Sequence, residues 1–135
     1  MIYLDSAAVI KLCHTEQETA ALVGWLGERP ERPLVSSALV EVEVPRALRR
    51  NAAGALPSAP AVLDSLYRLD IDHTVRATGA AYDADNLRSV DAIHLATAQV
   101  LGGRSGEELD FVTYDRRLLK SAAHLGFTTA SPGQE

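Results

Sequence analysis

The stretch Met1-Ile2-Tyr3-Leu4-Asp5-Ser6 decides how the rest of the chain is interpreted. Its first four residues are apolar and aromatic types that favour a β-strand, and the strand stops abruptly at Asp5. The next run, from Ala7 to Leu12, is more typical of a helix. A carboxylate between a buried strand and a helix lies at the carboxyl end of a sheet, where ligands bind in open α/β folds. The sequence therefore predicts that chemistry is organised around Asp5.

Composition favours one domain without a membrane segment. The chain has 135 residues, of which 47% are hydrophobic, enough to build one core. No segment approaches the roughly 20 apolar residues that a membrane-spanning helix needs. Cys13 is the only cysteine, so no internal disulfide can form, and a reducing cytoplasm fits this composition. The net charge of −5 argues against bulk coating of nucleic acid, but it does not exclude a nucleic-acid enzyme with an acidic metal site.

Short strands alternate with helices along the chain. After the strand at 1–4 we expect strands at 34–36 and 109–113, a short extended segment at 69–71 and a last strand at 127–129. Thr15 and Thr74 are expected N-caps, residues 51–60 a linker and 102–106 a flexible loop. The expected helices span 7–12, 15–28, 39–50, 61–67, 74–82, 90–101 and 116–124. Because tight hairpin signals are few, this order predicts a three-layer α/β/α sandwich with a mostly parallel central sheet.

A second strand ends in the same way as the first. Asp115 follows the strand at 109–113 and precedes a helix. If both strands are central and parallel, Asp5 and Asp115 lie at the same edge of the sheet. Each carboxylate can also be explained as a helix N-cap, a position that Asp fills well. Both explanations stay open for each of the two residues.

Asp91 is an acid on an apolar helix face. It lies in the first turn of the helix at 90–101, and the same face carries Leu95 at i+4 and Ala98 at i+7. Acids are stabilised in a first turn by the helix dipole. The dipole explains where Asp91 lies along the helix axis, but it does not explain the face, so we expect this carboxylate to point toward the edge of the core.

Glu43 shows the same pattern in the helix at 39–50. Its neighbours four residues before and after are Leu39 and Ala47, whereas its rival Glu41 has a serine and a proline at those positions. Glu43 is therefore the better candidate for an inward acid, although a solvated glutamate remains an alternative at this position.

Four inward carboxylates close together could not all stay charged without a counter-charge. Hard divalent cations such as Mg²⁺ or Mn²⁺ are the natural partners of carboxylate oxygens. Such a site supports hydrolysis, because the metal polarises a phosphate and lowers the pKa of a bound water. The histidines predict no zinc site, since they are scattered and each is better explained by a packing or surface role: His14, His73, His94 and His124.

Four stretches that span nearly the whole chain together resemble one known family, the PIN-domain ribonucleases, and within it the VapC-type toxins of bacterial toxin–antitoxin pairs. They are MIYLDSAAVIKL at 1–12, SSALVEVEVPRALRR at 36–50, LRSVDAIHLATA at 87–98 and FVTYDRRLLKSAAHLG at 111–126. The resemblance implies a PIN-like nuclease domain at 1–130, followed by a loose C-terminal tail at 131–135.

The resemblance also implies an activity, that of a metal-dependent endoribonuclease. The family's four acids correspond to Asp5, Glu43, Asp91 and Asp115. Mg²⁺ or Mn²⁺ is implied on the three aspartates, with Glu43 holding a ligand water or a second metal. Ser6 and Thr113 match residues that support the acids or position the substrate.

Further implied features concern partners. The substrate is RNA, and the candidate phosphate contacts are Lys11, Arg46, Arg88, Arg116 and Arg117. The family also implies a homodimer and a cognate antitoxin, whose C-terminal segment occupies a groove over the first helices. Such a groove could be lined by Ala8, Leu12, Leu22, Trp25 and Leu26. Ordinary core packing is the alternative for these residues, and it is favoured for Trp25.

Two other functions are compatible with parts of the pattern. Phosphohydrolases with an aspartyl nucleophile also begin with a strand that ends in Asp. They need a second Asp two residues later, and here that position is Ala7. A catalytically silent domain that only binds a partner would be expected to lack one of the four acids, and none is missing here.

Overall fold

The computed structural model describes residues 1–134, and within them the strands form a single parallel sheet. The order is β3-β2-β1-β4-β5, and every pairing between neighbours is parallel. The predicted parallel sheet is thus confirmed. The strands are β1 (Ile2–Leu4), β2 (Leu34–Ser37), β3 (Tyr67–Leu69), β4 (Asp110–Val112) and β5 (Thr128–Ala130).

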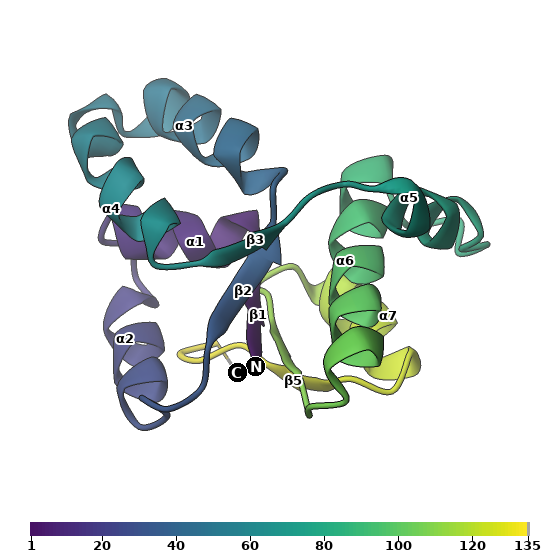
Figure 1. The fold of residues 1–135 in the computed structure, drawn as a ribbon. Helices are drawn as coiled ribbons and strands as arrows, with labels where there is room; N and C mark the ends of the chain where they lie inside the picture. The colour runs from purple at the N-terminus through teal and green to yellow at the C-terminus, as the bar shows by residue number, and fades with distance from the viewer. Residues whose placement is uncertain (135) are drawn as a thin grey trace.

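Helices cover both faces of this sheet, which confirms the three-layer α/β/α sandwich (Figure 1). One face carries α1 (Ser6–Cys13), α2 (Thr19–Gly27), α3 (Val40–Asn51) and α4 (Ala59–Asp64). The other carries α5 (His73–Ala80), α6 (Ser89–Ser105) and α7 (Arg116–His124). None of these helices in residues 1–134 combines the length and apolar character needed to cross a bilayer.

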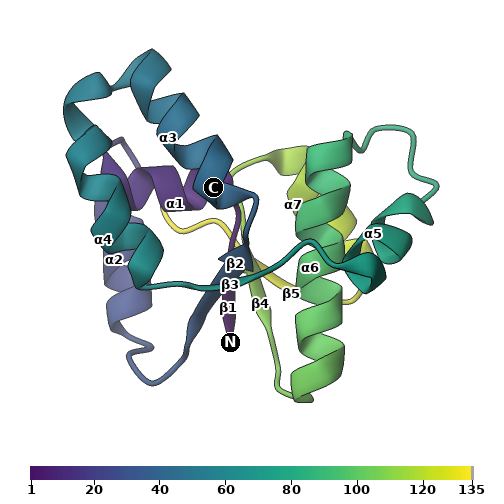
Figure 2. The same cartoon turned by 45° about the horizontal axis from the view of Figure 1, so that its top comes forward.

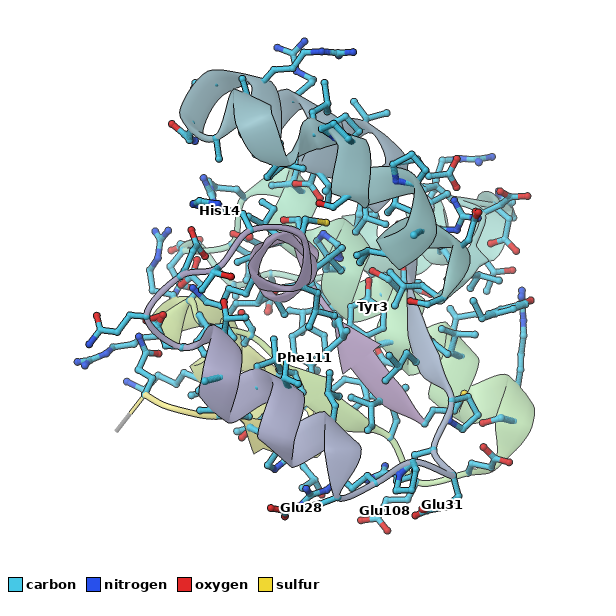
Figure 3. The ribbon with its side chains drawn as sticks, turned by 90° about the vertical axis from the view of Figure 1, so that its left-hand side faces the viewer. Tyr3, His14, Glu28, Glu31, Glu108 and Phe111 are labelled. Atoms are coloured by element: carbon cyan, nitrogen blue, oxygen red, sulfur yellow. The ribbon has the colours of Figure 1, made fainter. Side chains whose placement is uncertain are left out.

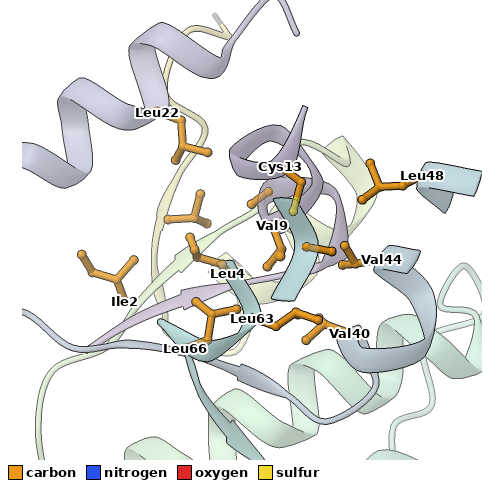
Figure 4. Close-up of a cluster of buried hydrophobic side chains, with 13 residues drawn as sticks. Ile2, Leu4, Val9, Cys13, Leu22, Val40, Val44, Leu48, Leu63 and Leu66 are labelled. Atoms are coloured by element: carbon orange, nitrogen blue, oxygen red, sulfur yellow. The ribbon is translucent and has the colours of Figure 1, made fainter. Parts of the chain in front are cut away.

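The central strand β1 divides the core into two halves. Its side chains alternate between the faces of the sheet, as the two-residue period of a strand requires. Ile2 and Leu4 pack with Val9, Val44 and other residues of α1 to α4 (Figure 4). Tyr3 points to the opposite face, toward α6. Because β1 is buried on both faces, it reads as a continuous apolar run, which is typical of parallel sheets.

The expected linker at 51–60 is largely helical. Residues Ala53–Ser58 form a 3₁₀ helix, η1, and α4 starts at Ala59. Pro60 falls in the first turn of α4, where the missing N–H of proline costs no hydrogen bond. The strand that follows, β3, lies two residues earlier than the expected 69–71. The segment at 51–60 is therefore a tight helical connection and not the linker that its Gly, Pro and Ser residues predicted.

Helix ends also differ from the expectations. Asp72 caps α5 in place of Thr74, because its Oδ1 accepts a hydrogen bond from the Val75 N–H at 2.9 Å. The helix α2 starts only at Thr19, so Thr15 is no N-cap. At its other end, α6 continues through the expected loop at 102–106 and stops at Gly106, whose φ of 68° is the left-handed conformation that ends many helices.

The residues expected to form a loose tail contact the sheet region in two places. The Ser131 hydroxyl donates to the Thr113 carbonyl at 2.6 Å, and the Tyr114 hydroxyl donates to the Pro132 carbonyl at 2.8 Å. These bonds hold the chain beside the end of β4. Residue 135 of the expected tail lies outside the described residues.

Gly79 tests the packing of α5 against α6. A Cβ at Gly79 would lie 3.3 Å from the Ala92 carbonyl oxygen, whereas a Cβ at Gly24, in α2, would meet nothing within 4 Å. Both glycines are helical, so leucine gains similar helix propensity at each. We expect Gly79→Leu to lower the free energy of unfolding by about 1–3 kcal/mol relative to Gly24→Leu, because overpacking forces the helices apart. Urea unfolding of the two variants measures this difference, and equal stabilities would contradict it.

Candidate active site

The parallel pairing of β1 with β4 brings two of the predicted acids to one edge of the sheet. Leu4 pairs with Val112, so Asp5 and Thr113 directly follow two neighbouring strands. Asp115 comes two residues after Thr113. Figure 2 shows the strands running upward from the N-terminus, with the starts of α1, α3, α6 and α7 near their upper ends. This edge is the one at which the sequence predicted a site.

Asp5 is both a helix cap and a buried carboxylate. Its side chain is only 4% exposed. Oδ1 accepts a hydrogen bond from the Ala8 N–H at 3.0 Å, which caps α1, and Oδ2 accepts one from the Thr113 hydroxyl at 2.5 Å. The structure confirms the cap explanation for Asp5, and the same carboxylate lies at the edge of the sheet where the sequence predicted a site.

Thr113 links two of the acids. Its hydroxyl donates to Asp5 and accepts from the Asp115 N–H at 3.1 Å. Asp115 in turn caps α7, because its Oδ1 accepts from the N–H groups of Arg117 and Leu118. The Thr113 hydroxyl therefore connects the Asp5 carboxylate to the backbone of Asp115. Ser6 has no comparable side-chain hydrogen bond within residues 1–134.

Asp91 lies at the first turn of α6 and is 6% exposed. Its Oδ2 accepts hydrogen bonds from the backbone N–H of Arg88 at 3.2 Å and from Nε of the same residue at 3.3 Å. The carboxylate is thus buried on the inner face of the helix, as its apolar neighbours predicted. It also satisfies an N–H at the helix start, which the dipole explanation did not require.

Glu43 points inward and Glu41 does not. The Glu43 Oε1 lies 2.8 Å from His94 Nε2, and the His94 ring is 2% exposed. Glu41 instead pairs with Arg68 at the surface, at 3.4 Å. The helical-face argument therefore selected the inward acid correctly. His94 was assigned a packing role, and its place beside Glu43 was missed.

Electrostatic effects show that these groups share one neighbourhood. Burial raises the pKa of the Asp5 carboxyl, and the charge of Glu43 raises it further, against the opposing effects of His94 and the hydrogen bonds from Thr113 and Ala8. The pKa of the Arg88 guanidinium is raised first by its hydrogen bond to Asp91 and by the charge of that residue. The charges of Asp115 and Glu43 add to the increase. Glu43 thus affects the pKa of Asp5, and Asp91, Asp115 and Glu43 all affect the pKa of the Arg88 guanidinium.

Three of the four acids have only one of their two carboxylate oxygens hydrogen-bonded to the protein. Asp91, Asp115 and Glu43 each have one oxygen bonded to the protein and a second without a donor within residues 1–134. Every buried side-chain oxygen of these residues has a hydrogen-bond partner. The second oxygens have none, so they must be accessible to solvent. In their present positions no three acidic, His or Cys side chains of the described residues form a set of ligands for one ion. The donor chemistry fits a hard divalent cation, provided that the free oxygens turn toward it.

The candidate phosphate contacts fall into two groups. Lys11 is already paired, with Glu16 at 3.0 Å and Glu18 at 3.2 Å, and Arg88 is paired with Asp91 at 3.3 Å. Arg117 approaches Asp115 at 3.8 Å. Arg46 and Arg116 are exposed, and among residues 1–134 neither has an acidic partner. On α3, Arg46 lines a shallow recess together with two further exposed residues, Arg49 and Arg50.

The proposed groove residues are not equally accessible. Ala8 and Leu22 are fully buried in the core beneath α1 and α2, so they cannot line a surface groove. Leu12, Trp25 and Leu26 are partly exposed and pack against the edge of the same core. The Arg29 guanidinium covers the Trp25 ring at 3.9 Å.

Comparisons with known proteins give the family. The PIN domain family matches residues 2–125. This chain belongs to the PIN-domain family. Ribonuclease VapC35 of Mycobacterium tuberculosis is 46% identical over 134 residues, covering 99% of this chain and 98% of the relative. Ribonuclease VapC46 of the same organism is 40% identical, covering 97% of each chain, and Ribonuclease VapC47 is 38% identical, covering 98% of each.

These relatives place this PIN-domain chain in the VapC group, as the four sequence stretches indicated. A solved structure described as a toxin–antitoxin complex from Klebsiella pneumoniae has the same fold, with a TM-score of 0.70 and 20% identity over 98% of each chain. At that identity the likeness supports the arrangement of the layers and not the chemistry of the PIN-domain site.

Asp5 provides a test of the site's electrostatics. Because burial raises the pKa of its carboxyl in the folded state, the stability that this group contributes is fully present below the unfolded pKa. It is lost as the pH rises through the folded pKa. We therefore expect Asp5→Asn to be at least as stable as the wild type at pH 7 in chelator. This advantage should shrink as the pH falls toward pH 5.

Urea unfolding across this pH range measures the difference, and Asp70→Asn is the control, because Asp70 is exposed. Asparagine is also a good N-cap, so the cap of α1 survives the change. A free energy of unfolding clearly below that of the wild type at pH 7 would contradict the expectation.

Proposed function

We propose that this protein is a metal-dependent endoribonuclease that acts as the toxin of a toxin–antitoxin pair. The observation that carries the proposal is the identity of 46% with Ribonuclease VapC35 over nearly the whole of both chains. The four acids at the carboxyl edge of the sheet support it. Asp5 directly follows β1, and Asp115 comes three residues after the end of the neighbouring parallel strand β4.

In this proposal Asp5, Asp91 and Asp115 hold a divalent cation, Mg²⁺ or Mn²⁺, and Glu43 holds a ligand water or a second metal. A bound cation of this kind polarises a phosphate and lowers the pKa of a coordinated water. Thr113 fixes Asp5 through its hydroxyl. Glu43 accepts the proton of the attacking water, and hydrolysis leaves a 5′-phosphate and a 3′-hydroxyl.

Arginine side chains on α3 are proposed to bind the RNA backbone. Arg46 follows Glu43 by three residues and Arg50 by seven, so both lie near the same side of the helix as the catalytic acid. Arg49 completes the shallow recess beside them. The three side chains are exposed and have no acidic partner within the described part of the chain. Arg116, at the start of α7, is a further candidate contact.

The remaining proposals concern partners and location. A cognate antitoxin would cover the partly exposed side chains of Leu12, Trp25 and Leu26. The relatives named VapC and the complex from Klebsiella pneumoniae favour such a partner. We further propose that the protein is a homodimer and that it acts in the cytoplasm, which agrees with its single, unpaired cysteine.

RNA cleavage by the purified protein tests the activity. We expect cleavage in Mg²⁺ or Mn²⁺ and none in chelator. Asp5→Asn should reduce the rate by at least about 100-fold, because a lost metal ligand costs more than the 10–100-fold typical of its outer partners. Circular dichroism should show that the variant remains folded. Asp70→Asn, which changes an exposed carboxylate, is the control. Equal cleavage by Asp5→Asn and the wild type would refute the proposal.

The salt dependence of RNA binding tests the arginines. In an inactive Asp5→Asn background, we expect the combined changes Arg46→Gln, Arg49→Gln and Arg50→Gln to flatten the plot of log affinity against log salt by about 2. Each phosphate contact to a single strand contributes about 0.7 to this slope. Arg76→Gln, on α5, serves as the control, and an unchanged slope in the triple variant would exclude α3 from the RNA path.

A further inference from the structure

Three side chains form a buried chain of hydrogen bonds that ends at the site. The Tyr3 hydroxyl lies 2.7 Å from His94 Nδ1, and His94 Nε2 lies 2.8 Å from Glu43 Oε1. Tyr3 is fully buried and stacks on Phe111 with ring centroids 5.0 Å apart. Figure 3 labels both residues in the middle of the molecule. These residues come from β1, α6 and α3. The chain therefore ties a central strand to helices on both faces of the sheet.

The proton between His94 and Glu43 can be assigned from geometry. An ionised carboxylate can only accept a hydrogen bond, so the bond of 2.8 Å to Oε1 places a proton on His94 Nε2. The Tyr3 hydroxyl can donate or accept, so it satisfies Nδ1 of the ring in either case. His94 is therefore the donor to Glu43, and its ring is held at both nitrogens.

We propose that His94 is a positioning residue, which holds the Glu43 carboxylate in one orientation through the buried chain that begins at Tyr3. The proposal rests on the proposed function, in which Glu43 accepts a proton from water. With Oε1 held by His94, the other oxygen, Oε2, has no donor within residues 1–134. The rotation of a glutamate whose side chain is 23% exposed is thereby restricted, and Oε2 is kept in place for the reaction. Catalysis gains when a reacting group is held in its productive geometry.

A purely structural role for His94 gives different expectations. A buried histidine with two satisfied nitrogens also stabilises the core, and its replacement would then lower activity only by lowering the folded fraction. The two roles can be distinguished by substitutions that each replace only one of the two ring nitrogens of His94. The amide of glutamine reaches about as far as Nε2, and the amide of asparagine reaches only about as far as Nδ1.

We expect His94→Gln to keep the bond to Glu43 and to retain cleavage within a few-fold of the wild type. His94→Asn should lose that bond and lower kcat by about 10–100-fold, the range typical of outer partners in metal sites, with little change in KM. Both variants place an amide in the same buried position, so their melting temperatures should be similar. Equal kcat values for the two variants, or a kcat that follows the melting temperature, would overturn the proposal.

A measurement that needs no activity separates this inference from the proposed function. Imidazole ¹⁵N resonances of the folded, metal-free protein should show the His94 proton on Nε2, with slow exchange with solvent. Glu43→Ala should speed that exchange, whereas Glu41→Ala should leave it unchanged, because Glu41 pairs with Arg68. An Nε2 without a proton, or exchange as fast as that of the exposed His73, would overturn the positioning role. Absence of RNA cleavage by the wild type, with the nitrogen signals as expected, would refute the proposed function alone.

Discussion

The parallel pairing of β1 with β4 is the constraint on which the site depends. Their register places Leu4 opposite Val112, so Asp5 and Thr113 leave the sheet side by side. In an antiparallel pair the two strands would end at opposite edges. Because all the strands of the sheet are parallel, the helix starts that follow them gather at the same edge. The direction of the strands therefore determines that the acids meet at one edge of the sheet, whichever residues carry out the chemistry there.

Local hydrogen bonds hold the acids in place at this edge. Asp5 and Asp115 cap the helices that follow them, and Asp91 accepts from the N–H of Arg88 at the start of α6. Each aspartate satisfies a backbone N–H that a helix leaves unpaired. A polar side chain that is buried without a partner is costly, and these bonds remove much of that cost. The same residues thus contribute to the ends of helices and to the proposed catalytic site.

The sequence predicted the sheet, both helical layers and the positions of the acids, because these depend on short-range patterns. Strand ends, apolar faces and acid positions can all be read within about ten residues. It did not predict that Asp72 caps α5, since Thr74 is an equally acceptable cap by type. It did not predict that α6 runs through Gly102 and Gly103, because the low helix propensity of glycine favoured a loop there, and the helix ends only at Gly106.

The place of His94 beside Glu43 shows a different limit. The two residues are 51 positions apart, and their contact exists only because α3 and α6 approach the same strand edge from opposite faces. The only local signal was that His94 follows Asp91 by three residues on a helix with an apolar face, which does not distinguish a packed histidine from a positioning one. The burial of Tyr3 is a further indication, because a fully buried phenol needs a hydrogen-bond partner, and here that partner is His94.

The starts of the helices also explain how the site can hold several negative charges before any cation binds. Asp5, Asp91 and Asp115 each lie at the first turn or N-cap of a helix, where the helix dipole and free N–H groups favour negative charge. Arg88 adds a positive charge close to Asp91. This compensation is incomplete at Asp5, because burial raises the pKa of its carboxyl in spite of two hydrogen bonds. Burial therefore disfavours the charged form of Asp5, and the proposed divalent cation would offset this effect.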